Sequence, residues 1–486
     1  MTSIRAKLYL YWAVPFLLFL LQAVFTLRSM PQLRYEELAE SVRNVYWLEQ
    51  RTIYDGFSSN IGWYGTILVI YRLFGFWLYG AKFVRLALSL ISLLALASVF
   101  AKYLPPERAW LPLSIFGLSP TLLYFNTLQT SYGIDLQYFP ITLYIVLSLN
   151  FSSRAVAFAK EVLLGVIAMW ACLSFPAFLF YLPVLTILFL QRLLRDAGHH
   201  GRSVVVKNVL VVLGGFLLPL SLIARLKDPS LLIFDPRLRS GIFRGGGVFS
   251  WDPMHMPTSV IQILIDLFRH ATSYYFEVAS VDFSNWFPLA AVCLIAIFSL
   301  VFGLWRHNEL LAHSLAWTTL SLNLIAAHLT GGPPGIRRAT PSLAAIYALV
   351  AITCYELPRL KTSVRLFKIV LKCGVLLILV HHLLAVPQNY TQLSATSPSQ
   401  YKLFFLEEGT PGRSLDHLVQ EAQRADLRLS CSGPQADCRY AEVYAAVSGA
   451  CLWNHLACHN VLGFDYKSQQ FIALRTELWE SYYLQH

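Results

Sequence analysis

Long uncharged apolar runs alternate with short polar segments along most of the chain. A run of about 20 apolar residues is what a helix needs to cross the hydrocarbon core of a membrane. The first run, Leu8–Leu27, follows Arg5 and Lys7 and precedes no small-residue cleavage site, so we expect a retained anchor. Further predicted spans lie at residues 57–79, 86–103, 109–126, 134–150, 160–190, 207–224, 286–305, 310–328, 340–356 and 368–387.

The distribution of Lys and Arg decides between eleven and twelve spans. The 160–190 run contains Pro176 and Pro183, so it is either one kinked span or two. Counting it once gathers the basic residues of the short loops on one side, which the positive-inside rule identifies as cytoplasmic. These residues are Lys82, Arg85, Arg192, Arg195, Arg202, Arg306, Arg359, Lys361 and Arg365. The prediction is therefore an all-α polytopic membrane protein with eleven spans and with outer loops at 28–56, 225–285 and 329–339.

The composition supports this class and excludes others. The chain is 56% hydrophobic and 13% charged, against about 45–50% and about 25% in ordinary globular proteins. Twelve Trp and 25 Tyr suit the aromatic belts found where helices leave a bilayer. A cytosolic enzyme, a disordered scaffold and a secreted disulfide miniprotein are excluded. The net charge of +11 does not indicate a nucleic-acid partner, because the basic residues lie between apolar runs.

Residues 388–486 differ from the transmembrane domain at 1–387 in charge and in cysteine spacing. The first part carries 31 Lys and Arg against 17 Asp and Glu, and the second carries seven against ten. We expect a small external α/β domain with helices near 414–427 and 440–452 and a strand at Gln470–Leu474. In a short external segment an even number of cysteines favours disulfides, here two, among Cys431, Cys438, Cys451 and Cys458. A metal site with His455 and His459 stays open, although the spacing is not that of a standard zinc site.

The cysteines within the predicted spans have a simpler interpretation. Cys172, Cys293, Cys354 and Cys373 are expected to be ordinary packing residues. The middles of the spans hold almost no ionisable groups, which disfavours an ion-coupled transporter. Chemistry is therefore expected in the outer loops. Asp135 falls in a short inner turn of this topology, where we expect a structural role.

The loop after the first span carries the clearest candidate chemistry. If residues 34–47 are helical, Glu36, Glu40 and Arg43 share a face with Trp47, and Glu37 lies beside them. Paired carboxylates just outside a membrane suit a general base or a clamp for sugar hydroxyls. The alternative is an amphipathic helix that lies on the membrane surface and has no chemical role.

The order of motifs after this loop resembles a known family. The acidic pair is followed by Ile61–Thr66, by Tyr71–Gly75 and by Lys82–Leu86, and a later Gly335–Pro341 segment carries two arginines. This order is similar to that of the GT-C superfamily of membrane glycosyltransferases, in the branch of protein O-mannosyltransferases and lipid A aminoarabinose transferases. One position departs from the family, which usually has Asp where this chain has Glu36.

The resemblance implies transfer of a sugar from a polyprenyl-phosphate donor to an acceptor at the outer face. Glu36 or Glu37 would act as the base, with Asp55 as a further candidate. Arginine suits the leaving phosphate because its planar fork matches phosphate oxygens. The implied substrate-binding residues are Arg337, Arg338, Arg244, Arg43, Trp63 and Tyr64. No cofactor is required by this chemistry, and use of a divalent metal is left open.

The same resemblance sets the expected partners and location. These are membrane lipid, the polyprenyl-phosphate-linked sugar and a glycan, lipid or protein acceptor, with no nucleic acid, in a bacterial inner membrane with the loops and the tail outside. The 225–285 loop, with Gly245–Gly247 and a predicted interfacial helix at Pro257–Val278, would form a lid or only a flexible connector. Two other functions stay open: a lipid-linked sugar transporter or flippase, and a non-catalytic assembly or receptor protein.

Overall fold

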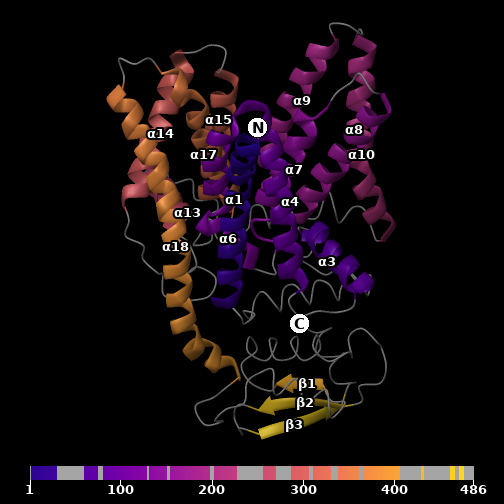
Figure 1. Ribbon diagram of the computed structural model, residues 1–486. Helices are drawn as coiled ribbons and strands as arrows, with labels where there is room; N and C mark the ends of the chain where they lie inside the picture. Colours follow the sequence, from indigo (N-terminus) through magenta and orange to yellow (C-terminus); the bar gives the residue numbers. More distant parts are fainter. Residues whose placement is uncertain are drawn as a thin grey trace.

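The structure is a computed structural model, and most of its described part is a bundle of helices that run up and down beside one another (Figure 1). It describes residues 2–29, 60–74, 80–127, 131–149, 154–197, 202–226, 255–269, 286–305, 310–329, 338–360, 365–405, 428–431, 460–465 and 470–475. The helices are α1 (Thr2–Ser29), α3 (Ile61–Phe74), α4 (Gly80–Tyr103), α5 (Pro106–Gly117), α6 (Pro120–Thr127), α7 (Asp135–Leu147), α8 (Arg154–Ser174), η2 (Pro176–Tyr181), α9 (Leu182–Ala197), α10 (Arg202–Leu226), α13 (Met256–Arg269), α14 (Trp286–Trp305), α15 (Leu310–Leu329), α17 (Thr340–Glu356), η4 (Leu357–Arg359) and α18 (Arg365–Phe405).

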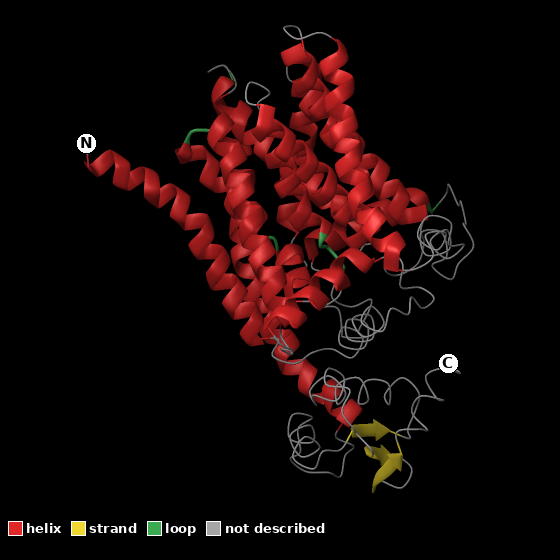
Figure 2. Ribbon diagram, turned by 90° about the vertical axis from the view of Figure 1, so that its right-hand side faces the viewer, coloured by secondary structure: helices red, strands yellow, loops and turns green. Residues whose placement is uncertain are grey.

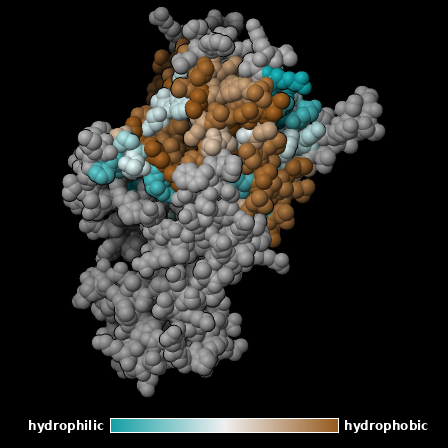
Figure 3. All heavy atoms as spheres, turned by 90° about the vertical axis from the view of Figure 1, so that its left-hand side faces the viewer, coloured by the Kyte–Doolittle hydropathy of each residue, from teal (hydrophilic) through white to brown (hydrophobic). Residues whose placement is uncertain are grey.

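Apolar side chains on the outside of the bundle agree with the predicted all-α polytopic membrane protein. Leu21, Leu94 and Leu366 are each more than half exposed. On the face shown in Figure 3, apolar residues cover most of the described surface and hydrophilic ones gather near its margins. Six described helical segments are long and apolar enough to cross a membrane, namely Gly80–Tyr103, Ala155–Ser174, Pro176–Arg195, Leu310–Leu329, Thr340–Arg359 and Arg365–Ala385.

The predicted span at 57–79 is wrong. The described helix there, α3, has 14 residues, which at about 1.5 Å per residue is shorter than the hydrocarbon core of about 30 Å. Trp63 at the start of α3 and Arg85 near the start of α4 lie against each other, with the guanidinium carbon 5.6 Å from the ring centroid. A crossing between them would have put these residues on opposite sides. The hydropathy-based prediction failed here because a short helix with one buried apolar face is as hydrophobic as part of a membrane span.

The 160–190 run is also corrected, because it holds two antiparallel helices rather than one kinked span. Pro176 begins η2 after Phe175, whose extended backbone ends α8. Late in α9, Arg192 donates a 3.3 Å hydrogen bond to the carbonyl of Leu149, which precedes α8. The end of α9 therefore lies beside the start of α8. The prediction thus loses one span at 57–79 and gains one here, while six helices of the described part are long and apolar enough to cross a membrane.

These two corrections move Asp135 and Arg85 to the other side of the bundle. Both were predicted opposite the 329–339 loop, yet Asp135 accepts a hydrogen bond from Thr340, directly after that loop. The backbone carbonyl of Tyr132 accepts one from Arg85. The starts of α4, α7 and α17 therefore lie together, and we call this the site end of the bundle. Arg192 remains at the opposite end, as predicted.

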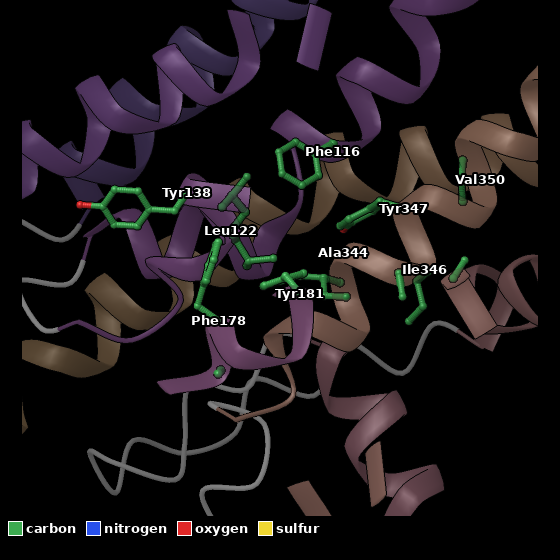
Figure 4. Packing of buried hydrophobic residues seen from close by; sticks show 14 of the residues in the cluster. Phe116, Leu122, Tyr138, Phe178, Tyr181, Ala344, Ile346, Tyr347 and Val350 are labelled. Atoms are coloured by element: carbon green, nitrogen blue, oxygen red, sulfur yellow. The ribbon is translucent and has the colours of Figure 1, made fainter. Parts of the chain in front are cut away.

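Aromatic side chains fill the core between α5, α7, η2 and α17, as Figure 4 shows. Phe139 and Tyr181 stack with ring centroids 4.3 Å apart, and Tyr181 lies 5.4 Å from Phe178. Phe116 and Tyr347 meet edge to face at 5.6 Å. Such pairs add to the free energy gained from burying the rings alone. They join α7 to η2 and α5 to α17.

Two glycines allow α8 and α10 to pack closely. A Cβ atom on Gly165 would lie 2.2 Å from the carbonyl oxygen of Val212, and one on Gly215 would lie 2.5 Å from that of Val162. Small residues at such contacts let helix backbones approach within a membrane. The pair α8 and α10 is thereby held beside α7 and α3.

The C-terminal part extends from the bundle through α18. This helix continues to Phe405, past the predicted domain boundary at residue 387 (Figure 2). Beyond it, strands β1 (Arg428–Cys431), β2 (Asn460–Asp465) and β3 (Gln470–Arg475) form a sheet in that order, with β1 and β2 parallel and β2 and β3 antiparallel. The predicted strand at Gln470–Leu474 is confirmed as β3. The predicted helices at 414–427 and 440–452 lie outside the described residues.

Other local predictions are confirmed in part. The first part of the predicted interfacial helix is α13, which buries Ile263, Leu267 and Phe268. The four span cysteines are free, but only Cys354 is buried and Cys172 partly buried as expected of packing residues, whereas Cys293 and Cys373 are exposed. Cys431 lies in β1, whereas Cys438, Cys451 and Cys458 lie outside the described residues, so the disulfides stay a prediction.

Candidate functional site

A buried carboxylate lies at the centre of the site end. Asp135 is the first residue of α7 and is fully buried. Its Oδ2 atom accepts hydrogen bonds from the Thr340 hydroxyl at 2.7 Å and from the Tyr181 hydroxyl at 3.1 Å. An acidic residue at this position is stabilised by the positive end of the helix dipole. The second oxygen, Oδ1, has no hydrogen-bond partner among the described residues.

The turn before α7 delivers Asp135 to this place. Gly133 has a φ of +72°, a conformation that L-residues with side chains rarely adopt, and a Cβ atom there would lie 2.5 Å from the ring of Phe125. The N–H of Ile134 donates to the carbonyl of Ser131 at 3.2 Å and closes the turn. Glycine is therefore required both by the backbone conformation and by the space.

Arg85 holds the same turn from α4. Its side chain is fully buried, and its guanidinium donates to the carbonyl of Tyr132. The guanidinium also lies over the ring of Trp63, an arrangement stabilised by the attraction between a cation and a π system. The positive charge of Arg85 acts on the Asp135 carboxylate. A cation and an anion are thus fixed within one buried cluster.

Two further cations flank this pair. Lys82, in the first turn of α4, is only 2% exposed. Arg338 is partly buried just before α17, and its burial lowers the pKa of the guanidinium, while the neighbouring Tyr132 raises it. The guanidinium of arginine keeps its proton in proteins, so Arg338 is a cation. Lys82, Arg85 and Arg338 therefore place three cationic side chains at the site end, and cationic side chains attract anionic ligands.

A polar network lies next to the carboxylate and joins α4, α6 and α7. The Ser89 hydroxyl donates to Oδ1 of Asn126 at 2.8 Å, and the Gln137 amide donates to Ser89 at 2.8 Å and to Asn126. All three side chains are buried. Ser89 lies one turn after Arg85 in α4, and Gln137 follows Asp135 by two residues in α7. This network ties α4, α6 and α7 together close to the two charged residues.

Only some of the residues predicted to bind substrate lie together in the described structure. Trp63 and Tyr64 are fully buried on α3, so Trp63 supports Arg85 instead of lining an open surface. Thr66 and Trp170 tie α3 to α8 through a 3.0 Å hydrogen bond. Arg338 lies just before α17 beside Tyr132, and its substrate-binding role stays a prediction. The other predicted site residues, Glu36, Glu37, Arg43, Asp55, Arg244 and Arg337, lie outside the described residues.

Sequence reasoning missed the centre of the site. The predicted topology assigned Asp135 a structural role on the inner side, and it did not connect Thr340 or Tyr181 to any chemistry. A local signal was present, because Gly133 comes just before a predicted span, Asp135 lies at its start, and no other carboxylate is nearby in the sequence. Within the described residues, no group of three or more His, Cys, Asp or Glu side chains could hold a metal ion.

Two solved structures share this fold. The crystal structure of ArnT from Cupriavidus metallidurans in the apo state has a TM-score of 0.55 at 13% sequence identity, over 95% of this chain and 93% of that chain. ArnT from Cupriavidus metallidurans bound to undecaprenyl phosphate has a TM-score of 0.51 at 13% identity and the same coverage. No family model and no curated protein sequence matches the chain. The likeness shows that this chain shares the fold of ArnT, and at this identity it shows nothing beyond the fold.

Proposed function

We propose that this protein transfers a sugar from a polyprenyl-phosphate-linked donor to an acceptor at the site end of the bundle. In this reaction the bond between the anomeric carbon and the phosphate oxygen breaks, and a bond from that carbon to the acceptor oxygen or nitrogen forms. The acceptor proton passes to a carboxylate, and polyprenyl phosphate leaves. The fold shared with ArnT, one structure of which contains undecaprenyl phosphate, supports this class of donor.

One observation carries the proposal, the incompletely bonded carboxylate of Asp135. Oδ2 is held by two hydroxyls, while Oδ1 has no partner among the described residues. A buried polar atom without a partner costs free energy, and such atoms are rare unless a ligand or water supplies the missing bond. A substrate hydroxyl would supply that bond. The carboxylate thereby orients a sugar or acceptor hydroxyl for the reaction.

The cations have a separate role in the proposal. Arg338, with Arg337 and Arg244, binds the donor phosphate, and the buried charges of Lys82 and Arg85 raise the positive potential around it. The developing charge on the leaving phosphate is stabilised by groups that are already oriented, which lowers the barrier to transfer. Glu36 or Glu37 is proposed as the base, since the first outer loop carries the family's acidic pair. The acceptor is a glycan, a lipid or a protein.

The proposal is tested by measuring transfer with the purified full-length chain in lipid vesicles. A panel of radiolabelled polyprenyl-phosphate sugars is supplied with acceptor-rich membranes, for the wild type and for Asp135→Asn, Glu36→Gln and Glu37→Gln. We expect transfer by the wild type and its loss in Asp135→Asn and in one of the two glutamate variants. Movement of the sugar lipid across the membrane without a new glycosidic bond would instead support a flippase. Absence of both, with the chain folded, would contradict the proposal.

A further inference from the structure

The side-chain amide of Asn323, on α15, bonds the chain on both sides of Thr340, the residue whose hydroxyl bonds Asp135. Asn323 is fully buried. Its Nδ2 atom donates to the carbonyl of Arg338 at 3.0 Å. Its Oδ1 atom accepts from the Ser342 hydroxyl at 2.8 Å and from the Ser342 N–H at 3.0 Å. Thr340, whose hydroxyl bonds Asp135, lies midway between Arg338 and Ser342 in the chain.

The start of α17 has little other means of fixing its conformation. The residue before it, Ala339, has no polar side chain to cap the helix. Pro341 has no N–H, and the Thr340 hydroxyl is committed to Asp135. The N–H groups of Ser342 and Leu343 bond the carbonyl of Ala339 at 3.0 and 3.4 Å. Asn323 therefore supplies from another helix the cap that this segment lacks.

Packing between α15 and α17 does not require an amide. Leu320, Leu324, Leu343 and Ile346 are buried apolar residues on these helices. A buried amide is costly to desolvate unless all its bonds are made, so its presence among these residues points to a geometric role.

We propose that Asn323 is a positioning residue of the site, and this inference rests on the proposed function. Its amide clamps the backbone on both sides of Thr340, so that the Thr340 hydroxyl meets Asp135 and Arg338 is held at the donor phosphate. Asn323 itself contacts neither substrate nor reacting atoms. Its effect on transfer passes chiefly through Thr340.

Kinetics of matched variants test the proposal. Asn323→Ala removes both halves of the clamp, and Asn323→Asp keeps the acceptor for Ser342 but loses the donor to Arg338. Thr319→Ala is the control, because Thr319 is also buried on α15 and its hydroxyl bonds only the carbonyl of Leu315, in its own helix, among the described contacts. In vesicles with an undecaprenyl-phosphate sugar, we expect kcat to fall about tenfold to hundredfold in Asn323→Ala, less in Asn323→Asp, and less than about twofold in Thr319→Ala.

A double-mutant cycle separates positioning from general destabilisation. If Asn323 acts through Thr340, then adding Asn323→Ala to Thr340→Val lowers kcat by less than about threefold further. Two independent effects would multiply and would overturn the proposal, as would a folded Asn323→Ala variant with the kcat of the wild type. Should Asn323→Ala fail to fold, Ser342→Ala removes one hydrogen bond of the clamp and is expected to lower kcat in the same direction. A Ser342→Ala variant with unchanged kcat would then overturn the proposal.

Hydrogen exchange distinguishes failure of this inference from failure of the proposed function. If the wild type transfers sugar from no donor, the proposed function fails, but the clamp is still measurable in the full chain. We expect the backbone amides of Ser342 and Leu343 to exchange at least about fivefold faster in Asn323→Ala than in the wild type or Thr319→Ala. Unchanged exchange at these amides would overturn the clamp itself.

Discussion

The hydroxyl of Thr340 donates a 2.7 Å hydrogen bond to Oδ2 of Asp135, although the two residues are 205 positions apart in the chain. This bond joins the start of α17 to the start of α7. It also brings a segment that carries Arg338 to a turn that is held by Arg85. The candidate site is therefore assembled from helix starts that come from both halves of the transmembrane domain.

The first prediction concerns the charge of Asp135. Asp135→Asn keeps the shape of the side chain and an oxygen that can accept from Thr340 and Tyr181, but it removes the negative charge. We expect kcat for sugar transfer to fall about hundredfold or more, because substrate orientation depends on this carboxylate. Thermal unfolding in detergent is expected to show a midpoint equal to or above that of the wild type, since a buried charge has been removed. A folded variant with full activity would give Asp135 a structural role only.

The second prediction separates charge from geometry at Arg85. Arg85→Lys keeps a positive charge, but an ammonium cannot reproduce the planar fork that bonds the carbonyl of Tyr132 while stacking on Trp63. We expect loss of at least about tenfold in kcat/KM and a lower unfolding midpoint. The control is Arg195→Lys. Arg195 is exposed near the end of α9, away from the site, so this substitution should leave kcat/KM and the unfolding midpoint unchanged. Equal behaviour of the two variants would argue against a role for Arg85 in holding the turn.

The third prediction concerns the turn that presents Asp135. Gly133→Ala places a methyl group 2.5 Å from the Phe125 ring at a backbone φ of +72°. We expect a loss of about 1–3 kcal/mol in the free energy of unfolding, together with reduced transfer. Gly65→Ala is the matched control, because its Cβ would meet only the ring of Trp170, at 3.5 Å. Chemical denaturation of both variants in the same detergent provides the comparison.

Hydropathy predicted the helical membrane class correctly, but it could not assign the sides of the bundle. The α3 segment and the α8–α9 pair were both misread from apolar length, because length alone does not distinguish a short packed helix or a hairpin from one crossing. The two errors cancel in the number of predicted spans, but the loops between α3 and the α8–α9 pair were assigned to the wrong end of the bundle. Asp135 was therefore assigned to the wrong side, where its chemistry looked irrelevant.

The centre of the site depends on contacts that no local pattern reports. The partners of Asp135 are Tyr181 and Thr340, which come from η2 and α17, and neither belongs to a motif with Asp135. Arg338 was a candidate because the Gly335–Pro341 segment resembles the arginine-bearing element of the GT-C family, and its phosphate-binding role stays a prediction. The acidic pair Glu36 and Glu37 stays a prediction, since these residues lie outside the described part of the chain.

The last prediction tests the close pairing of α8 and α10, which supports α3 and α7 from behind. Gly215→Ala would bring a methyl group to 2.5 Å from the Val162 carbonyl, so the two backbones must separate. Its neighbour Gly214 has nothing within 4 Å of the added atom, so Gly214→Ala meets no obstacle and gains helix propensity of about 1 kcal/mol. We expect the unfolding midpoint in detergent to fall for Gly215→Ala and to stay equal or rise for Gly214→Ala. Because adjacent residues of one helix differ only in what they face, equal shifts in the two variants would show that α8 and α10 do not pack as closely as described.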